Sequence, residues 1–279
     1  MTEVSRAMRV SREIPFVKAH ACGNDFLIVE ESDADQNHRE LARRLCKRNT
    51  SVGADGIEFL HRRADGSYFL RLINADGSEA ELSGNGTRCV ASWLAYSEQM
   101  REVVLHTHGG PKACSVVRAD GTRFEIESEM GVPRAVERTI ELPTMGAVIG
   151  VEVNIGNPHF VVFVDDDGFE ADGRSWQHVG EAICTSPLFP NGTNVEFVHR
   201  VSKNKIEIRI YERGVGPTSS SGTGTCASAT AAIAMHGAAR QLTVDAPGGS
   251  QQVVWPADNA VMQLTGPAEI ICWGGRAAL

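Results

Sequence analysis

The sequence Ser83-Gly84-Asn85-Gly86-Thr87 recurs, with one change, as Ser221-Gly222-Thr223-Gly224-Thr225. The two copies lie 138 residues apart, and the same separation relates Arg71 to Arg209. A second match, of residues 23–26 with 156–160, lies upstream at an offset of 133 residues. Self-similarity at so long a period indicates two copies of one domain rather than a solenoid. The alternative, a common capped turn that occurs twice by chance, does not explain why the strand, turn and helix signals stay in phase.

Each copy of this turn stands at the start of a predicted helix. The first backbone N–H groups of a helix lack partners within it, and together with the helix dipole they attract an anion. The third glycine of a dinucleotide fingerprint and the lysine of a P-loop are both missing from these turns. Two such turns related by pseudo-symmetry therefore predict two helix N-termini aimed at one carboxylate, with Ser83 and Ser221 on opposite sides of it.

Strand signals dominate the rest of the chain. They cover residues 16–18, 26–30, 67–74, 103–107, 114–118 and 123–128, and then 148–154, 160–165, 195–201, 205–211, 251–255 and 260–265. Helical patterns are fewer, over residues 37–46, 86–97, 176–184 and 224–236. Many short strands with one long helix in each half predict an α+β fold of two similar, barrel-like domains rather than a parallel α/β sheet.

The domain boundary is expected in residues 129–143, because this segment is polar and contains proline. The first domain should then comprise residues 15–135 together with 266–279, and the second residues 136–265. Residues 1–14 are polar and charged, which predicts a disordered extension and excludes a signal peptide there.

The composition is ordinary for a soluble globular protein, with 42% hydrophobic and 22% charged residues. The net charge of −8 disfavours nucleic acid or an anionic membrane as the main partner, but it does not disfavour a small anionic substrate. Seven scattered cysteines without a C-x-x-C pair argue against a disulfide framework or a zinc site and favour a reducing cytoplasm. No apolar run approaches the length of a membrane helix.

Eight pieces of the sequence, in order, resemble the diaminopimelate epimerase family. They are residues 18–26 (KAHACGNDF), 53–56 (GADG), 74–78 (NADGS), 84–89 (GNGTRC), 156–159 (GNPH), 211–216 (YERGVG), 222–224 (GTG) and 247–249 (PGG). The resemblance implies two similar domains, each a barrel-like sheet wrapped on a central helix, with the active site in the cleft between them. It also implies cofactor-independent inversion of an amino-acid α-carbon, from LL- to meso-diaminopimelate, for lysine and peptidoglycan precursor synthesis. A cytoplasmic homodimer without metal or cofactor is the arrangement it implies.

One departure from the family pattern affects the chemistry. The family has a cysteine at each of the two positions that are Ser83 and Ser221 here, and these thiols move protons on the two faces of the α-carbon. A thiol has a pKa near 8.5 and is tuned lower at a helix N-terminus, whereas a serine needs an adjacent base. By resemblance, His159 and Glu212 lie near the two reacting positions, and either could activate a serine. The alternatives are a turn residue for His159 and a salt bridge for Glu212.

The resemblance also implies a substrate shell. Its positions are Asn24, Asn74, Asn157 and Asn194 at the two ends of the substrate, Glu212 and Arg213 at the distal amino-acid group, and Gly84, Asn85, Gly222 and Thr223 at the helix-start anion site. Arg213 is the informative member, because arginine grips a carboxylate bidentately and so indicates a second acid group on the substrate. The asparagines have an alternative explanation in turn chemistry.

Three readings of the function remain open from the residues. The first is an epimerase of diaminopimelate type with serines at the acid/base positions. The second is a related racemase, isomerase or dehydratase that acts on another amino or hydroxy acid. The third is a catalytically silent or thiol-to-serine protein that still binds substrate. The intact asparagine, glutamate and arginine shell favours an active site over a drifted one.

Overall fold

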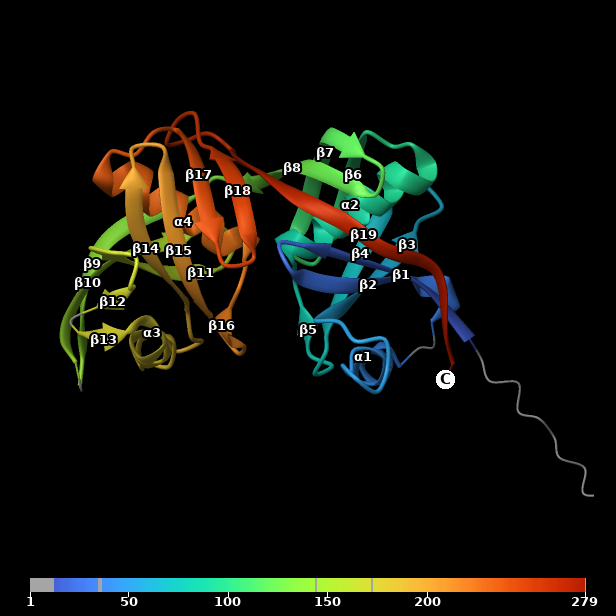
Figure 1. The fold of residues 1–279 in the computed structure, drawn as a ribbon, viewed down its shortest axis with the longest axis horizontal. Coiled ribbons are helices and arrows are strands. Elements are labelled where there is room, and N and C mark those ends of the chain that lie inside the picture. The colour runs from blue at the N-terminus through green and yellow to red at the C-terminus, as the bar shows by residue number, and fades with distance from the viewer. Residues whose placement is uncertain (1–12, 35–36, 144, 172, 279) are drawn as a thin grey trace, which may run out of the picture.

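The computed structural model describes residues 13–34, 37–143, 145–171 and 173–278. Figure 1 shows two lobes side by side, each a curved sheet around one long helix, joined by the strands β8 and β19. The predicted α+β architecture of two similar barrel-like domains is therefore confirmed.

The first lobe runs from the N-terminal end of the described chain to the end of β8. Its elements are β1 (Glu13–Ala21), β2 (Asn24–Glu30), η1 (Glu31–Asp33), α1 (His38–Leu45), β3 (Gly56–Arg62), β4 (Tyr68–Asn74), β5 (Glu79–Ala80), α2 (Gly84–Glu98), β6 (Glu102–Thr107), β7 (Gly110–Asp120) and β8 (Arg123–Gly131).

The second lobe repeats this series. Its elements are β9 (Arg134–Leu142), β10 (Gly146–Asn154), β11 (Pro158–Val164), β12 (Glu170–Ala171), β13 (Arg174–Ser175), α3 (Trp176–Cys184), β14 (Asn194–Ser202), β15 (Lys205–Glu212), β16 (Gly216–Thr218), α4 (Gly222–His236), β17 (Gln241–Ala246), β18 (Gly249–Val254) and β19 (Met262–Ala278).

The strand pairings of the two lobes match one another. In the first lobe β2–β3 is parallel, β3–β4 antiparallel, β4–β6 parallel and β6–β7 antiparallel. In the second lobe β11–β14, β14–β15, β15–β17 and β17–β18 follow the same order of directions. Strand β19 then pairs with β18, β8 and β1, so the last strand of the chain belongs to both lobes. The duplication read from the sequence is thus a duplication of topology.

Each barrel closes on a helix that is buried along most of its length. In α2 the side chains of Cys89, Val90 and Leu94 are inaccessible, and α4 is buried at every position from Gly224 to Ile233. An amphipathic surface helix keeps one polar face, so this pattern marks a central helix. The cysteines Cys89 and Cys226 lie in the two cores and not in the turns.

The passage from the first lobe to the second, between the end of β8 at Gly131 and the start of β9 at Arg134, lies inside segment 129–143. Most of that segment is strand, however, because Arg134–Leu142 forms β9 and pairs residue for residue with β10. Only one face of β9 is buried, through residues such as Ile140 and Leu142, so its composition is polar. The extension predicted over residues 1–14 is too long, because Glu13 and Ile14 pair with β19 in β1 and Ile14 is buried. Its first twelve residues lie outside the described chain, and the domain limits stay a prediction.

The strands β3 and β17 carried no strand prediction, and β19 was predicted only as far as residue 265. Residues 56–62 (GIEFLHR) mix apolar and charged side chains without strict alternation, so periodicity alone does not mark a strand there. No helix within the described ranges is long and apolar enough to cross a membrane.

Candidate active site

Ser83 and Ser221 are the N-caps of α2 and α4. The Oγ of Ser83 accepts a hydrogen bond from the Gly86 N–H at 3.0 Å, and the Oγ of Ser221 accepts one from the Gly224 N–H at 3.1 Å. Both serines have extended backbone and are partly exposed. A cap of this kind satisfies one of the free N–H groups of the first turn and leaves others available to a ligand. The two turns are therefore equivalent in structure as well as in sequence.

The N-termini of α2 and α4 meet between the lobes. A Cβ atom placed on Gly84 would lie 3.5 Å from the Cα of Gly222, and one placed on Gly222 would lie 3.4 Å from the Cα of Gly84. Such an approach leaves little room for larger side chains at either position. Because each glycine directly follows its serine, the contact brings Ser83 and Ser221 to one shared region, as the duplication predicted.

Arg88 donates hydrogen bonds to the first turn of α2 from the interior of the protein, and the sequence did not predict this role. It is fully buried, its Nη1 donates to the Gly84 carbonyl at 3.2 Å, and its Nη2 donates to Asn85 Oδ1 at 2.6 Å. Asn85 in turn donates from Nδ2 to Asn24 Oδ1 at 3.1 Å and to Ser220 Oγ at 3.2 Å. Asn85 therefore links the two lobes with a fixed amide orientation.

The asparagines of the predicted shell lie at one end of each barrel. In the first lobe Phe26, two residues after Asn24, pairs with Gly56, and Gly56 pairs with Asn74. In the second lobe Asn194 pairs with the residue that follows Pro158, close to Asn157. Strands that run in these directions place the asparagines of each lobe at one end of its barrel, where Asn24 contacts Asn85 and Asn157 contacts Thr223 of the helix starts. Asn74 also donates to Ser78 Oγ within its own turn, so the turn alternative holds for that side chain.

Asn24 is anchored by a charged network. Its Nδ2 donates to Asp55 Oδ2 at 2.7 Å, and Arg48 Nη2 contacts both Asp55 at 2.8 Å and Asp25 at 2.6 Å. Burial raises the pKa of Asp25, but hydrogen bonds from Arg48 and Lys18 outweigh it and bring that pKa below its ordinary value. An ionised, doubly bonded cluster of this kind fixes the loop that carries Asn24.

His159 is fully buried and both of its ring nitrogens are bonded. Nδ1 lies 2.8 Å from Glu196 Oε1, and Nε2 lies 3.0 Å from Asn157 Oδ1. The Nδ2 of Asn157 donates to Thr223 Oγ1 at 3.3 Å, so its Oδ1 faces the ring and Nε2 carries a proton. Burial raises the pKa of Glu196 above its ordinary value, and His159 beside it acts in the opposite direction. His159 thus reaches the Ser221 turn through Asn157 and Thr223 and bonds neither serine directly.

Glu212 is the last residue of β15 and Arg213 follows it, and among the described residues Glu212 forms no salt bridge to Arg213 or to another cation. The carboxyl of Glu212 is half-buried, and its pKa is raised by burial and further by Glu196, against a lowering by His159. The Arg213 N–H donates to Asn194 Oδ1 at 3.0 Å, and its Nη1 donates to the Asn191 carbonyl at 3.0 Å. Arg213 is exposed, so a ligand can approach its guanidinium.

Two buried glutamates, Glu58 and Glu196, lie beneath the two caps and were missed in the sequence. They are 138 residues apart, the separation of the two serines, and a Cβ on Gly86 or on Gly224 would meet their Oε1 atoms. The signal that could have found them is this offset, because each glutamate otherwise reads as one polar residue of an alternating strand.

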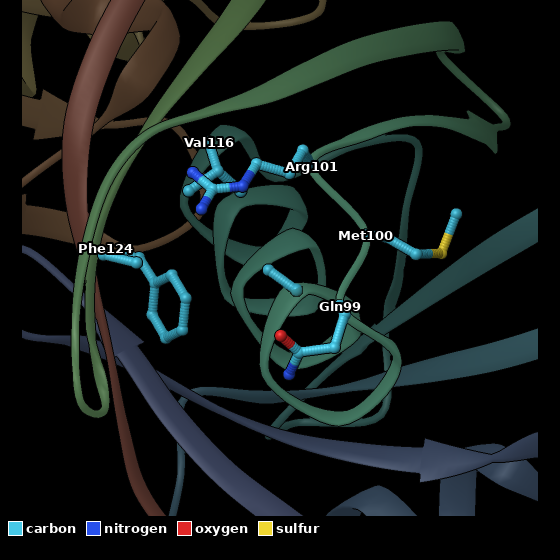
Figure 2. Close-up of a pocket in the computed structure, with 7 residues that line it drawn as sticks. Gln99, Met100, Arg101, Val116 and Phe124 are labelled. Carbon is cyan, nitrogen blue, oxygen red and sulfur yellow. The ribbon is translucent and has the colours of Figure 1, made fainter.

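Figure 2 shows a hollow at the other end of α2. Gln99, Met100, Arg101 and Phe124 surround it, on the loop after the helix and on β8. Its volume is about 70 Å³, which is less than an amino acid with two carboxylates occupies. The helix separates this hollow from Ser83, and none of the predicted site residues lines it.

The family model described as diaminopimelate epimerase matches residues 16–136 and 151–271. A diaminopimelate epimerase of Desulforudis audaxviator is 36% identical over 274 residues, covering 91% of this chain and 96% of that protein. One of a Synechocystis strain is 34% identical, covering 94% and 98%. The chloroplastic diaminopimelate epimerase of Oryza sativa is 33% identical, covering 94% of this chain and 80% of that protein.

Solved structures with the same fold come from several enzymes. A hydroxyproline epimerase from Agrobacterium vitis superposes with a TM-score of 0.71 and 16% identity, covering 98% of this chain and 94% of that one. A PhzF-family phenazine biosynthesis protein of Bacillus anthracis also has a TM-score of 0.71, with 14% identity and coverage of 96% and 99%. At these identities the likeness shows the fold alone.

Proposed function

Because this chain belongs to the diaminopimelate epimerase family, an isomerase family, we propose that it interconverts LL- and meso-diaminopimelate for lysine and peptidoglycan precursor synthesis. The observation that carries the proposal is the meeting of two capped helix N-termini at Gly84 and Gly222, with a serine at each. Inversion requires a base on one face of the α-carbon and an acid on the other, and this pseudo-symmetric arrangement supplies one hydroxyl on each side.

The substrate's reacting carboxylate belongs at the two helix starts. The N–H groups of the turns at Gly84–Asn85 and Gly222–Thr223, with two helix dipoles behind them, stabilise an anion there. They also stabilise the enediolate-like charge that develops on this carboxylate when the α-proton leaves. The side chains of Asn85 and Thr223 are already held, by Arg88 and by Asn157, so little reorganisation is needed.

The distal amino-acid group belongs at Glu212, Arg213 and Asn194. Arg213 suits a carboxylate, and Glu212 suits an ammonium group when it is ionised. Asn24, Asn74 and Asn157 lie at strand ends, and we assign them to the two ends of the substrate. A substrate with an amino acid at each end matches this distribution of charge.

Arg213→Ala is expected to weaken diaminopimelate binding about tenfold, and more than Ser83→Ala does. Arg213 bonds the distal carboxylate in ground and transition states alike, and an exposed charge-assisted bond contributes at the low end of about 1.5–3 kcal/mol. Titration calorimetry measures the change. Arg138→Ala, which removes an arginine paired with Glu152 at 2.9 Å on β9, is the matched control. Unchanged affinity in Arg213→Ala would mean that the substrate has no second acid group.

Proton–deuterium exchange at the α-carbon of diaminopimelate in heavy water tests the function. Exchange with inversion is the expected result. Exchange without inversion would indicate that only one of the two faces works, and no exchange would remove diaminopimelate as the substrate.

A second candidate function rests on the two serines. A related racemase, isomerase or dehydratase acting on another amino or hydroxy acid would use the same fold with other groups at the thiol positions. This candidate predicts that smaller amino acids or hydroxy acids exchange their α-protons while diaminopimelate does not.

We also propose a cytoplasmic homodimer, and sedimentation of the purified chain tests the dimer. Its first domain would comprise residues 15–135 plus 266–279, and its second domain residues 136–265.

A further inference from the structure

Glu58 is a buried carboxyl that none of the roles above uses. It lies in the middle of β3, pairs with Ile28 of β2 and Leu72 of β4, and is 1% exposed. Leu60, two residues along the strand, packs against α2 in the core, so Glu58 points to the same interior. Its Oε1 has no hydrogen-bond partner among the described residues. An unpaired carboxyl in an apolar interior costs stability, and such groups are retained mainly for function.

The carboxyl of Glu58 lies directly under the Ser83 cap. A Cβ on Gly86 would overlap Glu58 Oε1, and the same point is 3.2 Å from the Cβ of Ser83. Gly86 is also the residue whose N–H bonds Ser83 Oγ. The absence of a side chain at Gly86 therefore leaves one small space with the Glu58 carboxyl on one side and the Ser83 side chain on the other. No hydrogen bond joins these two described residues, so proton transfer requires the Ser83 hydroxyl to turn toward Glu58.

The second lobe repeats the arrangement with one difference. Glu196 lies under Gly224, where a Cβ would be 2.8 Å from Glu196 Oε1 and 3.3 Å from Ser221 Oγ. Glu196 has His159 as its partner. The first lobe has Phe26 at the position of His159, because Phe26 pairs with Gly56 as His159 pairs with Asn194. The first lobe thus has the buried carboxyl, as Glu58, but no imidazole beside it.

We propose that Glu58 is the proton partner of Ser83, so that the Ser83 hydroxyl relays a proton between the substrate's α-carbon and the buried carboxyl. The proposal rests on the proposed function. It assigns to Glu58 the task of exchanging a proton with Ser83, a task that an acidic thiol at position 83 would not need. Glu58 does not touch the substrate, and it is a positioning residue that acts through Ser83.

The relay balances without any further reactant. In one direction the Cα–H bond breaks and its electron pair stays on the α-carbon, while Ser83 Oγ takes that proton. The former hydroxyl proton of Ser83 passes to the Glu58 carboxylate, and a proton from the opposite face completes the inversion. In the reverse direction each proton returns along the same path, with the Glu58 carboxylic acid as donor.

The surroundings of Glu58 suit a group that exchanges a proton near neutrality. Burial alone raises its pKa to about 8. The Cys89 thiol faces Glu58 from α2. Burial raises the pKa of this thiol, Arg88 lowers it, and Glu58 raises it further. The neighbours of Glu58 on β2 and β4 are the apolar residues Ile28 and Leu72. A general acid or base works best when its pKa lies near the working pH, so Glu58 meets this condition and Ser83 alone does not.

The first test is Glu58→Gln, which keeps the shape and removes the titration. The kcat for α-proton exchange should fall about 10²-fold with KM within a factor of two, and the rise of rate toward pH 8 should disappear. Glu102→Gln, at an exposed carboxylate on β6, is the matched control. A normal kcat, or a loss of rate with the pH profile intact, would overturn the proposal.

A second variant separates the relay from a structural role. In Ser83→Cys the thiol is acidic enough to ionise without passing its proton to Glu58, so adding Glu58→Gln to it should lower kcat less than twofold. A loss as large as in the serine background would mean that Glu58 supports the fold of the cap instead of its proton transfer.

A titration without substrate distinguishes failure of this proposal from failure of the proposed function. In Ser83→Cys the thiolate absorbance should rise over a broadened pH range, because the introduced thiol and Glu58 titrate as a coupled pair. With Glu58→Gln added, the thiolate absorbance should rise in a single step, and the midpoint of that step should be displaced by about one pH unit. Identical titration curves would overturn the relay, even where diaminopimelate exchanges no proton.

Discussion

The double change Ser83→Cys with Ser221→Cys is expected to raise diaminopimelate epimerisation at least about tenfold, or roughly 1.4 kcal/mol of barrier. Both positions cap a helix, so the N–H groups and dipoles of α2 and α4 favour an anion there. A thiol at a helix N-terminus is partly ionised near neutral pH, whereas a serine hydroxyl stays protonated. Each positioned acid or base contributes about 10²–10⁴-fold when its pKa is matched to the working pH.

The single changes should each do less than the double change, because inversion needs a base on one face and an acid on the other. The measurement is the initial rate of inversion followed by chiral separation of the diaminopimelate isomers. Cys272 is exposed and distant in sequence from both turns, and Cys272→Ser in the same background controls for general effects of an accessible thiol. A folded, substrate-binding double variant that is no faster than the parent would favour a different reaction on a different substrate.

The larger sulfur atom should fit both caps. Ser83 and Ser221 are only partly buried, and each hydroxyl contacts the N–H of the residue three positions on. Thiols accept such a bond more weakly, so part of the capping energy, typically about 1 kcal/mol per helix, is lost. The measured melting temperature should therefore fall while the rate rises.

Sequence alone predicted the fold class because the same glycine-rich turn occurs at equivalent places in the two halves of the chain. The Ser-Gly-x-Gly-Thr turns give the two helix starts, and these are the N-caps of α2 and α4 in the structure. It did not predict β9, because an edge-like strand with one buried face has the polar composition of a linker. A different difficulty hid β19 beyond residue 265, where Gly266-Pro267 and Gly274-Gly275 interrupt the strand pattern as the strand leaves one lobe for the other.

The residues of the candidate site also divide into those that the sequence predicted and those that it did not. Asn24 and Asn157 were predicted because the motifs that carry the family resemblance contain them, whereas turn chemistry alone explains an asparagine at such a position without a ligand. Arg88 and Glu58 were not found, because a charged residue in a helix or strand is read as solvent-facing. Their burial follows from the closure of each barrel on its helix, which depends on contacts between segments far apart in the chain.

Glu58 should make the stability of this protein fall as the pH rises. Its pKa is about 8 in the folded state and near 4.5 when the chain is unfolded. A group whose folded pKa is raised contributes its full stability below the unfolded value, and that contribution is lost as the pH rises toward the folded value. The window is therefore pH 4.5 to 8, and the loss across it is on the order of 4 kcal/mol, at 1.36 kcal/mol per pKa unit.

Glu58→Gln removes this dependence, because the amide stays neutral in both states. Its free energy of unfolding, from urea denaturation at closely spaced pH values, should lose about 4 kcal/mol less than that of the parent between pH 4.5 and 8. Near pH 4.5 the two proteins should be similarly stable, since Glu58 is then protonated in the folded chain and only half ionised in the unfolded chain, a difference of about 0.4 kcal/mol. Glu102→Gln keeps the buried carboxyl and should follow the parent. Parallel curves for Glu58→Gln and the parent would show that Glu58 is ionised in the folded protein, with a compensating charge beside it.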